Sequence, residues 1–73
     1  MEETIPIKDF QFKVNFKENS AHFEGNGFLA EGTLHLLNNG GFTMTYATPP
    51  IRTEEVSNAI HLLSQEIFRR LKS

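Results

Sequence analysis

The apolar residues of this chain follow two different spacings, and the change between them constrains the fold most strongly. Up to residue 48 they recur mainly at every second position, as in the strictly alternating run from Phe10 to Lys17. From residue 54 onward they recur at intervals of three and four. A period of two indicates a half-buried strand, and the longer period indicates an amphipathic helix. The sequence therefore predicts an α+β fold, in which an antiparallel β-meander is followed by one C-terminal helix packed on one sheet face.

The meander is predicted to contain three strands, over residues 7–17, 21–37 and 41–48, or four if its central segment is divided. The division concerns Gly25-Asn26-Gly27, because apolar positions are odd-numbered before these residues and even-numbered after them. A bulge within one bent strand would shift the side chains in this way, and so would a tight loop between two strands. We favour the bulge, because the loop would leave only a very short strand before it. Residues 1–4 are expected to be frayed.

The first turn of the meander is predicted at Asn19-Ser20, between two alternating segments. A two-residue turn there would place Phe16 opposite Phe23. This register is favoured because it brings an aromatic pair together on the core face.

The last turn, over residues 38–41, permits two registers. A two-residue Asn39-Gly40 turn would place Leu37 opposite Phe42, whereas a three-residue loop with Gly40 in the left-handed conformation would place Leu36 there. We favour the three-residue loop, because it buries fewer charged groups.

The C-terminal helix is predicted over residues 54–72. Thr53 is a suitable N-cap, two glutamates follow it in the first turn, and basic residues occupy the last turn. These charges have the signs that the two ends of a helix dipole favour. The apolar stripe consists of Val56, Ala59, Ile60, Leu63, Ile67 and Leu71.

The length of 73 residues fits a single domain with a thin core, and the absence of cysteine excludes disulfides as reinforcement. Efficient packing or self-association must then stabilise the fold. Apolar residues outside the predicted core, and a final strand without proline or charge over residues 43–46, indicate a contact with a protein partner or a second copy. The two helix residues among them could instead widen the core seam. The candidate interface residues are Leu29, Leu37, Thr43, Thr45, Leu62 and Phe68.

Nucleic-acid binding is an alternative that the charge pattern disfavours. The formal net charge is −2, and phosphate binding requires clustered lysine and arginine. The candidate phosphate contacts are Lys13, Lys17, Arg69, Arg70 and Lys72.

A minimal enzyme that uses the histidines is a third hypothesis. His22 and His35 are expected on the polar sheet face with two glutamates, and His61 shares a helix side with two serines. The first group lacks the spacing of a metal site, and the second has no aspartate nearby in the sequence to orient it. A domain this small also has little room for a deep pocket. We therefore assign no catalytic residue, no metal site and no cofactor. Residues 25–30 match a glycine-rich dinucleotide fingerprint, but a strand is expected after them where the fingerprint requires a helix.

The interpretation that follows is a small non-enzymatic protein-binding module, such as a regulator, an inhibitor or an accessory subunit, which forms a homodimer. The acidic N-terminal residues do not match a secretory signal, and no apolar run is long enough to span a bilayer. The expected location is the cytoplasm, with no contact with a membrane.

Overall fold

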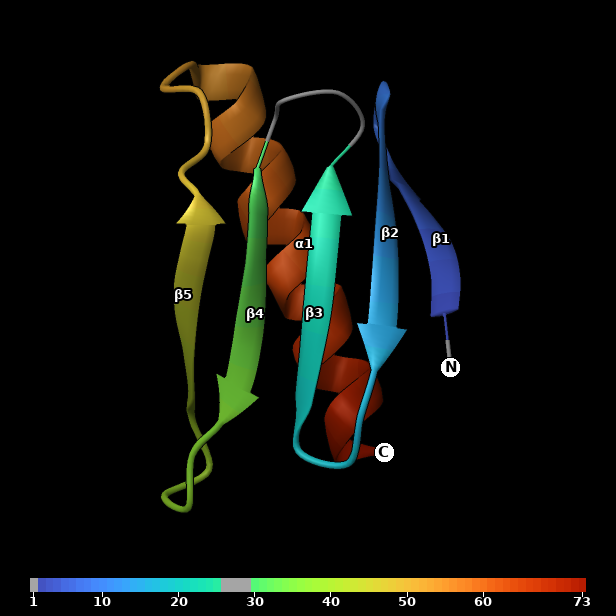
Figure 1. Cartoon of the computed structure of the whole chain (residues 1–73), viewed down its shortest axis with the longest axis vertical. Coiled ribbons are helices and arrows are strands. Elements are labelled where there is room, and N and C mark those ends of the chain that lie inside the picture. The colour runs from blue at the N-terminus through green and yellow to red at the C-terminus, as the bar shows by residue number, and fades with distance from the viewer. Residues whose placement is uncertain (1, 26–29) are drawn as a thin grey trace.

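The computed structural model describes residues 2–25 and 30–73, which form five strands followed by one helix. The sheet is antiparallel, its strands lie in chain order, and the helix crosses one face of it obliquely (Figure 1). The predicted α+β meander with a C-terminal helix is confirmed, whereas the predicted number of three or four strands is wrong. The elements are β1 (Glu2–Ile7), β2 (Phe10–Phe16), β3 (Ser20–Gly25), β4 (Glu31–Leu36), β5 (Phe42–Thr48) and α1 (Glu54–Lys72).

Strand β1 is the element that the sequence pattern missed. It pairs with β2 through a tight turn at Lys8 and Asp9, where Lys8 has a φ of 55°. Ile5 lies opposite Phe12 and is buried in the core, so the expectation of a frayed N-terminal segment and of one strand over residues 7–17 is wrong. Pro6 is compatible with β1 because this strand forms an edge of the sheet, where a missing N–H breaks no ladder hydrogen bond.

The turn between β2 and β3 lies one residue earlier than predicted. The Lys17 amide donates a hydrogen bond to the Ser20 carbonyl at 2.8 Å, and Phe16 lies opposite Ala21. The partner of Phe23 is Val14, so the predicted pairing of Phe16 with Phe23 is wrong. The difference of two positions along the partner strand is even, and every side chain therefore stays on its predicted face.

Strands β3 and β4 are separate and antiparallel, with Phe23 opposite Gly32. The Gly25 amide donates a hydrogen bond to the Ala30 carbonyl at 2.7 Å. The preferred interpretation of one bent strand over residues 21–37 is therefore wrong. Residues 26–29, which include the candidate interface residue Leu29, lie outside the described residues.

The β4–β5 hairpin has the predicted three-residue loop. Leu36 lies opposite Phe42, and Gly40 has a φ of 92°, a left-handed conformation that favours glycine. The Asn39 side chain accepts a hydrogen bond from the Gly41 amide at 2.9 Å and closes the loop. A register shift between Glu31 and Gly32 interrupts the other end of the hairpin.

Helix α1 spans the predicted residues and completes the core. The Thr53 hydroxyl accepts a hydrogen bond from the Val56 amide at 3.1 Å and caps the helix. Phe12 and Phe23 from the sheet and Leu63 from the helix are among the largest fully buried side chains. Within the described residues, no helix has the length and apolar character needed to cross a membrane. The buried core consists of Ile5, Phe12, Val14, Ala21, Phe23, Ala30, Leu34, Val56, Ala59, Ile60, Leu63 and Ile67.

Candidate interaction surface

Strand β5 forms one edge of the sheet and has an open side. In residues 2–25 and 30–73, β5 pairs only with β4, and β1 forms the opposite edge. Figure 1 shows helix α1 behind the sheet, so the helix does not cover the open side of β5. An edge strand presents unpaired backbone groups to a further strand.

The hairpin register determines which backbone groups of β5 face outward. The Leu37 amide donates a hydrogen bond to the Gly41 carbonyl at 2.9 Å, which makes these two residues a hydrogen-bonded pair. Such pairs alternate along an antiparallel ladder, so Thr43 and Thr45 direct their backbone groups toward β4. The backbone N–H and C=O groups of the intervening residues therefore point toward the open side. These residues are Phe42, Met44 and Tyr46.

The side chains of β5 alternate between the two sheet faces. Thr43 and Thr45 are exposed on the outer face, whereas Phe42 and Met44 pack against the core. Tyr46 stays 39% exposed although its ring meets Phe23 edge-on, with 6.0 Å between the ring centroids. Partial burial raises the pKa of the Tyr46 phenol above its ordinary value. We define residues 42–46 as the β5 edge surface.

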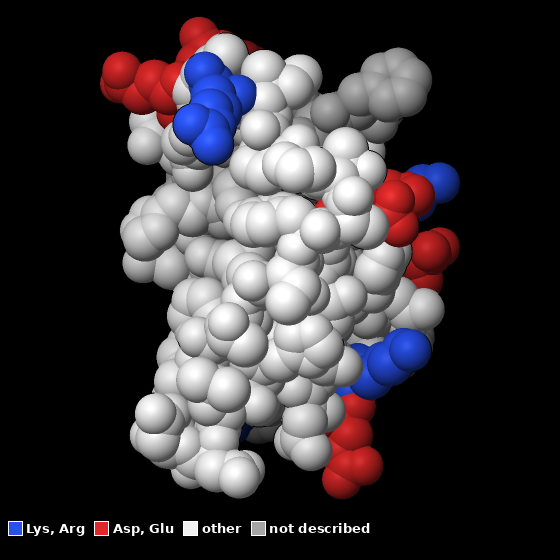
Figure 2. Space-filling view, turned by 60° about the vertical axis from the view of Figure 1, so that its left-hand side comes forward, with Lys and Arg blue, Asp and Glu red and all other residues white. Residues whose placement is uncertain are grey.

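The side of the molecule around the β5 edge surface carries few charges. No residue from Leu36 to Ile51 is charged, and Figure 2 shows a broad face without acidic or basic side chains, with charges at its upper end and along one margin. The adjoining helix flank contributes Phe68, whose ring lies 4.9 Å from that of Phe42 between centroids. The Lys72 ammonium caps this pair at 5.0 Å from the Phe68 ring. A partner could therefore approach this edge without pairing or desolvating a charge on β5.

The structure brings together three of the six candidate interface residues. Thr43 and Thr45 lie on β5, and Phe68 lies beside its first residue. Leu37 is 43% exposed at the end of the hairpin, whereas Leu62 is 39% exposed on the other flank of the helix. The sequence pattern indicated the edge over residues 43–46, but the candidate list did not include Phe42, Met44 and Tyr46, whose outward backbone groups follow from the hairpin register that it favoured.

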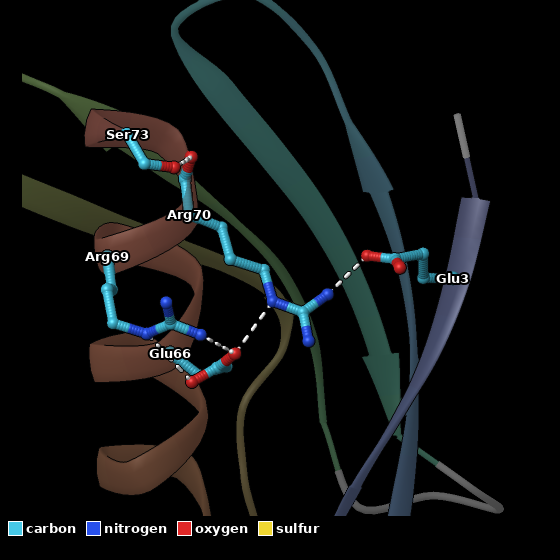
Figure 3. Close-up of polar contacts among 5 residues, drawn as sticks. All are labelled: Glu3, Glu66, Arg69, Arg70 and Ser73. Atoms are coloured by element: carbon cyan, nitrogen blue, oxygen red, sulfur yellow. Dashed lines mark hydrogen bonds and ion pairs between the residues drawn. The ribbon is translucent and has the colours of Figure 1, made fainter.

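The candidate phosphate contacts are dispersed, and two of them form ion pairs. Arg69 and Arg70 both donate hydrogen bonds to the Glu66 carboxylate, at 2.6 Å and 2.7 Å. Arg70 also bonds to Glu3 of β1, and Figure 3 shows its guanidinium bridging the helix and the strand. Lys13 lies exposed on the outer face of β2, in a different layer from the helix residues.

A shallow hollow of about 280 Å³ lies beside this network. Lys17 and Arg70 contribute positive charge to it, and Glu3 and Glu18 contribute negative charge. Because charges of both signs line the hollow, it does not favour the binding of an anion. The lining is completed by Phe16 and Leu71.

We expect the free energy of unfolding to depend on pH through the carboxyl group of Glu66. Hydrogen bonds from Arg69 and then from Arg70 lower the pKa of this carboxyl below its ordinary value of 4.5. A lowered pKa in the folded state means that the ionised carboxylate stabilises the fold above pH 4.5, and that this contribution is lost as the pH falls through the folded-state pKa.

Glu66→Gln is therefore expected to lower the urea midpoint slightly at neutral pH, and the difference from the wild type should disappear in acid. Glu2→Gln, at the exposed start of β1, is the matched control. A difference between Glu66→Gln and the wild type that stays constant from neutral to acidic pH would contradict this role of Glu66.

The three histidines lie beside different polar groups. His22 lies 3.0 Å from Glu31 between Nε2 and Oε2, and the His35 ring lies 3.5 Å from the Thr45 hydroxyl. The Ser64 hydroxyl donates to the backbone carbonyl of His61 at 2.7 Å, so it is directed toward the helix backbone. In the described part of the chain, no group of three or more histidine, aspartate or glutamate side chains could hold a metal ion.

Comparison with known proteins gave no match among family models, curated proteins or solved structures.

Proposed function

We propose that this chain is a small non-enzymatic protein-binding module, which binds an extended segment of its partner along the β5 edge surface. The observation that carries the proposal is the outward orientation of three consecutive backbone pairs, at Phe42, Met44 and Tyr46, on a strand without charge or internal proline. Strand addition to an exposed sheet edge gains affinity from main-chain hydrogen bonds and specificity from alternate side chains.

The surroundings of the edge support the same mode of binding. A segment added beside β5 would cover the exposed part of Tyr46 on the helix side and would meet Thr43 and Thr45 on the outer side. Natural edge strands that avoid partners commonly contain an internal charge or a proline, and β1 has both features while β5 has neither. The absence of cysteine suits the reducing cytoplasm, which is the compartment that we propose.

Selection of displayed peptides against the purified protein tests this function. The selected peptides should slow hydrogen exchange at the amides of Phe42, Met44 and Tyr46, because these amides would become ladder donors. At a concentration at which the free chain is monomeric, peptides that bind tightly and leave exchange at all three amides unchanged would refute the proposed mode.

A proline substitution provides the matched variant. Met44→Pro removes an outward N–H and leaves the hydrogen bonds between β4 and β5 in place, so we expect it to abolish peptide binding while the sheet persists. Met44→Leu keeps the N–H and a similar side-chain volume, and it should bind as the wild type does. If Met44→Pro does not fold, amide exchange in the wild type still decides the question.

A further inference from the structure

We propose that the partner of the β5 edge surface is a second copy of this chain, paired antiparallel so that Met44 lies opposite its own counterpart. This inference rests on the proposed function, because it names the partner of the same edge. The pairing joins the two sheets into one continuous sheet around a two-fold axis and leaves both helices on the same face. Such an interface is self-complementary and closes after two copies.

The register follows from the outward backbone groups. With Met44 at the axis, Phe42 of each copy lies opposite Tyr46 of the other, and all three outward residues of each copy form hydrogen-bonded pairs. If Thr43 or Thr45 lay at the axis instead, only two of these three outward residues would pair with one another across the interface. The Met44-centred register therefore satisfies the most backbone groups.

The side chains fit the same register. Phe42 and Tyr46 form an aromatic pair on the helix face in both halves of the interface. On the outer face, Thr43 lies opposite Thr45 in the non-hydrogen-bonded positions, where side chains approach most closely. No like charges meet, because β5 contains no charged residue.

The other edge explains why β5 should pair with itself and not with β1 of another copy. Strand β1 contains Pro6, which has no N–H, together with Glu2 and Glu3. A β1–β5 contact would therefore lack a ladder donor and would place carboxylates beside the edge. Such head-to-tail contacts would also build a ring or an open filament and not a two-fold dimer.

A charge exchange at residues 43 and 45 tests both the partner and the register. Sedimentation equilibrium of the wild type should show a monomer–dimer equilibrium. Thr43→Lys combined with Thr45→Lys places lysine opposite lysine twice, and should weaken dimerisation roughly tenfold. Thr43→Lys combined with Thr45→Glu places lysine opposite glutamate twice, and should restore dimerisation to at least the wild-type strength. Only the Met44-centred register predicts this restoration, because the neighbouring registers place residue 43 or 45 opposite itself.

A control variant separates charge from position. Gln11→Lys combined with Asn58→Lys adds the same charge on exposed sites of β2 and α1, and should leave the dimerisation constant within about threefold of the wild type. Circular dichroism establishes that each variant is folded. Tyrosine emission gives a second readout, since Tyr46 is the only tyrosine and tryptophan is absent. The emission should change with wild-type concentration over the range of the sedimentation transition.

Three outcomes would overturn the inference. They are a wild type that stays monomeric at its highest soluble concentration, continued growth into larger assemblies, and a Thr43→Lys/Thr45→Glu variant as weakly associated as the double-lysine variant. The proposed function fails separately. A monomeric wild type whose edge amides are still protected by selected peptides retains the binding function and loses only self-association.

Discussion

Phe12→Ala is expected to lower the free energy of unfolding by about 3–5 kcal/mol, because it removes a large side chain that is only 1% exposed. Phe12 lies in β2, between Ile5 of β1 and Gly25 of β3, and its ring is sealed beneath the helix. A domain gains roughly 0.05–0.15 kcal/mol of stability per residue, so a chain of this length has about 4–11 kcal/mol in total. The substitution would therefore remove a large part of the stability.

Urea unfolding followed by far-UV circular dichroism measures this loss. Phe68→Ala is the matched control, because Phe68 is only partly buried and packs on Phe42 at the margin of the core. We expect its cost to be clearly smaller than that of Phe12→Ala. Equal losses in the two variants would contradict the central position of Phe12.

Gly32→Ala is expected to cost about 1–3 kcal/mol, by crowding at a position where the backbone of β5 lies very close. A Cβ at residue 32 would lie 2.3 Å from the Thr45 carbonyl oxygen and 3.0 Å from the Phe23 ring. Tyr46 approaches the same site from the other side, so that Phe23 and Tyr46 meet edge-on across the glycine. The backbone of β5 must move to admit the methyl group, and the edge strand has no second neighbour in the described residues to hold it.

Gly41→Ala separates this crowding from the general effect of replacing a glycine. A Cβ at residue 41 would meet the Asn39 side-chain oxygen at 3.3 Å, and that side chain can move. Thermal unfolding should show a near-neutral effect for Gly41→Ala. Relative to the wild type, Gly32→Ala should accelerate amide exchange more along β5 than along β2. Equal melting temperatures for the two variants would show that the close approach at Gly32 has no energetic consequence.

Local chemistry was sufficient to predict the helix and the last hairpin. Thr53, the acidic first turn and the apolar stripe define the helix without reference to the rest of the fold. Gly40 defines the loop, because its left-handed conformation selects the register between β4 and β5. The same register fixes the open side of β5, so the main part of the candidate surface follows from the sequence.

Other features depend on contacts that a single sequence does not display. Strand β1 is short, and it is recognisable only through Ile5 packing into the core across from Phe12. The turn after it uses Lys8 with a positive φ, and no glycine or asparagine at that position indicates such a turn. At the next turn, the expected Phe16–Phe23 pair does not form, because the two-residue loop lies one position earlier and aligns Val14 with Phe23. The position of Phe68 against Phe42 likewise required the docked helix.

The order of the strands has a consequence for how this chain folds. Each strand hydrogen-bonds only to its neighbours in sequence, so the sheet can grow by short-range steps that cost little loop entropy. The link between Glu3 and Arg70 joins residues 67 positions apart, and it forms only when the helix returns to the first strand. We expect the hairpins to assemble rapidly and the docking of the helix on β1 to complete the native state. A chain still being synthesised would therefore hold its sheet uncovered until the final turns of the helix have emerged.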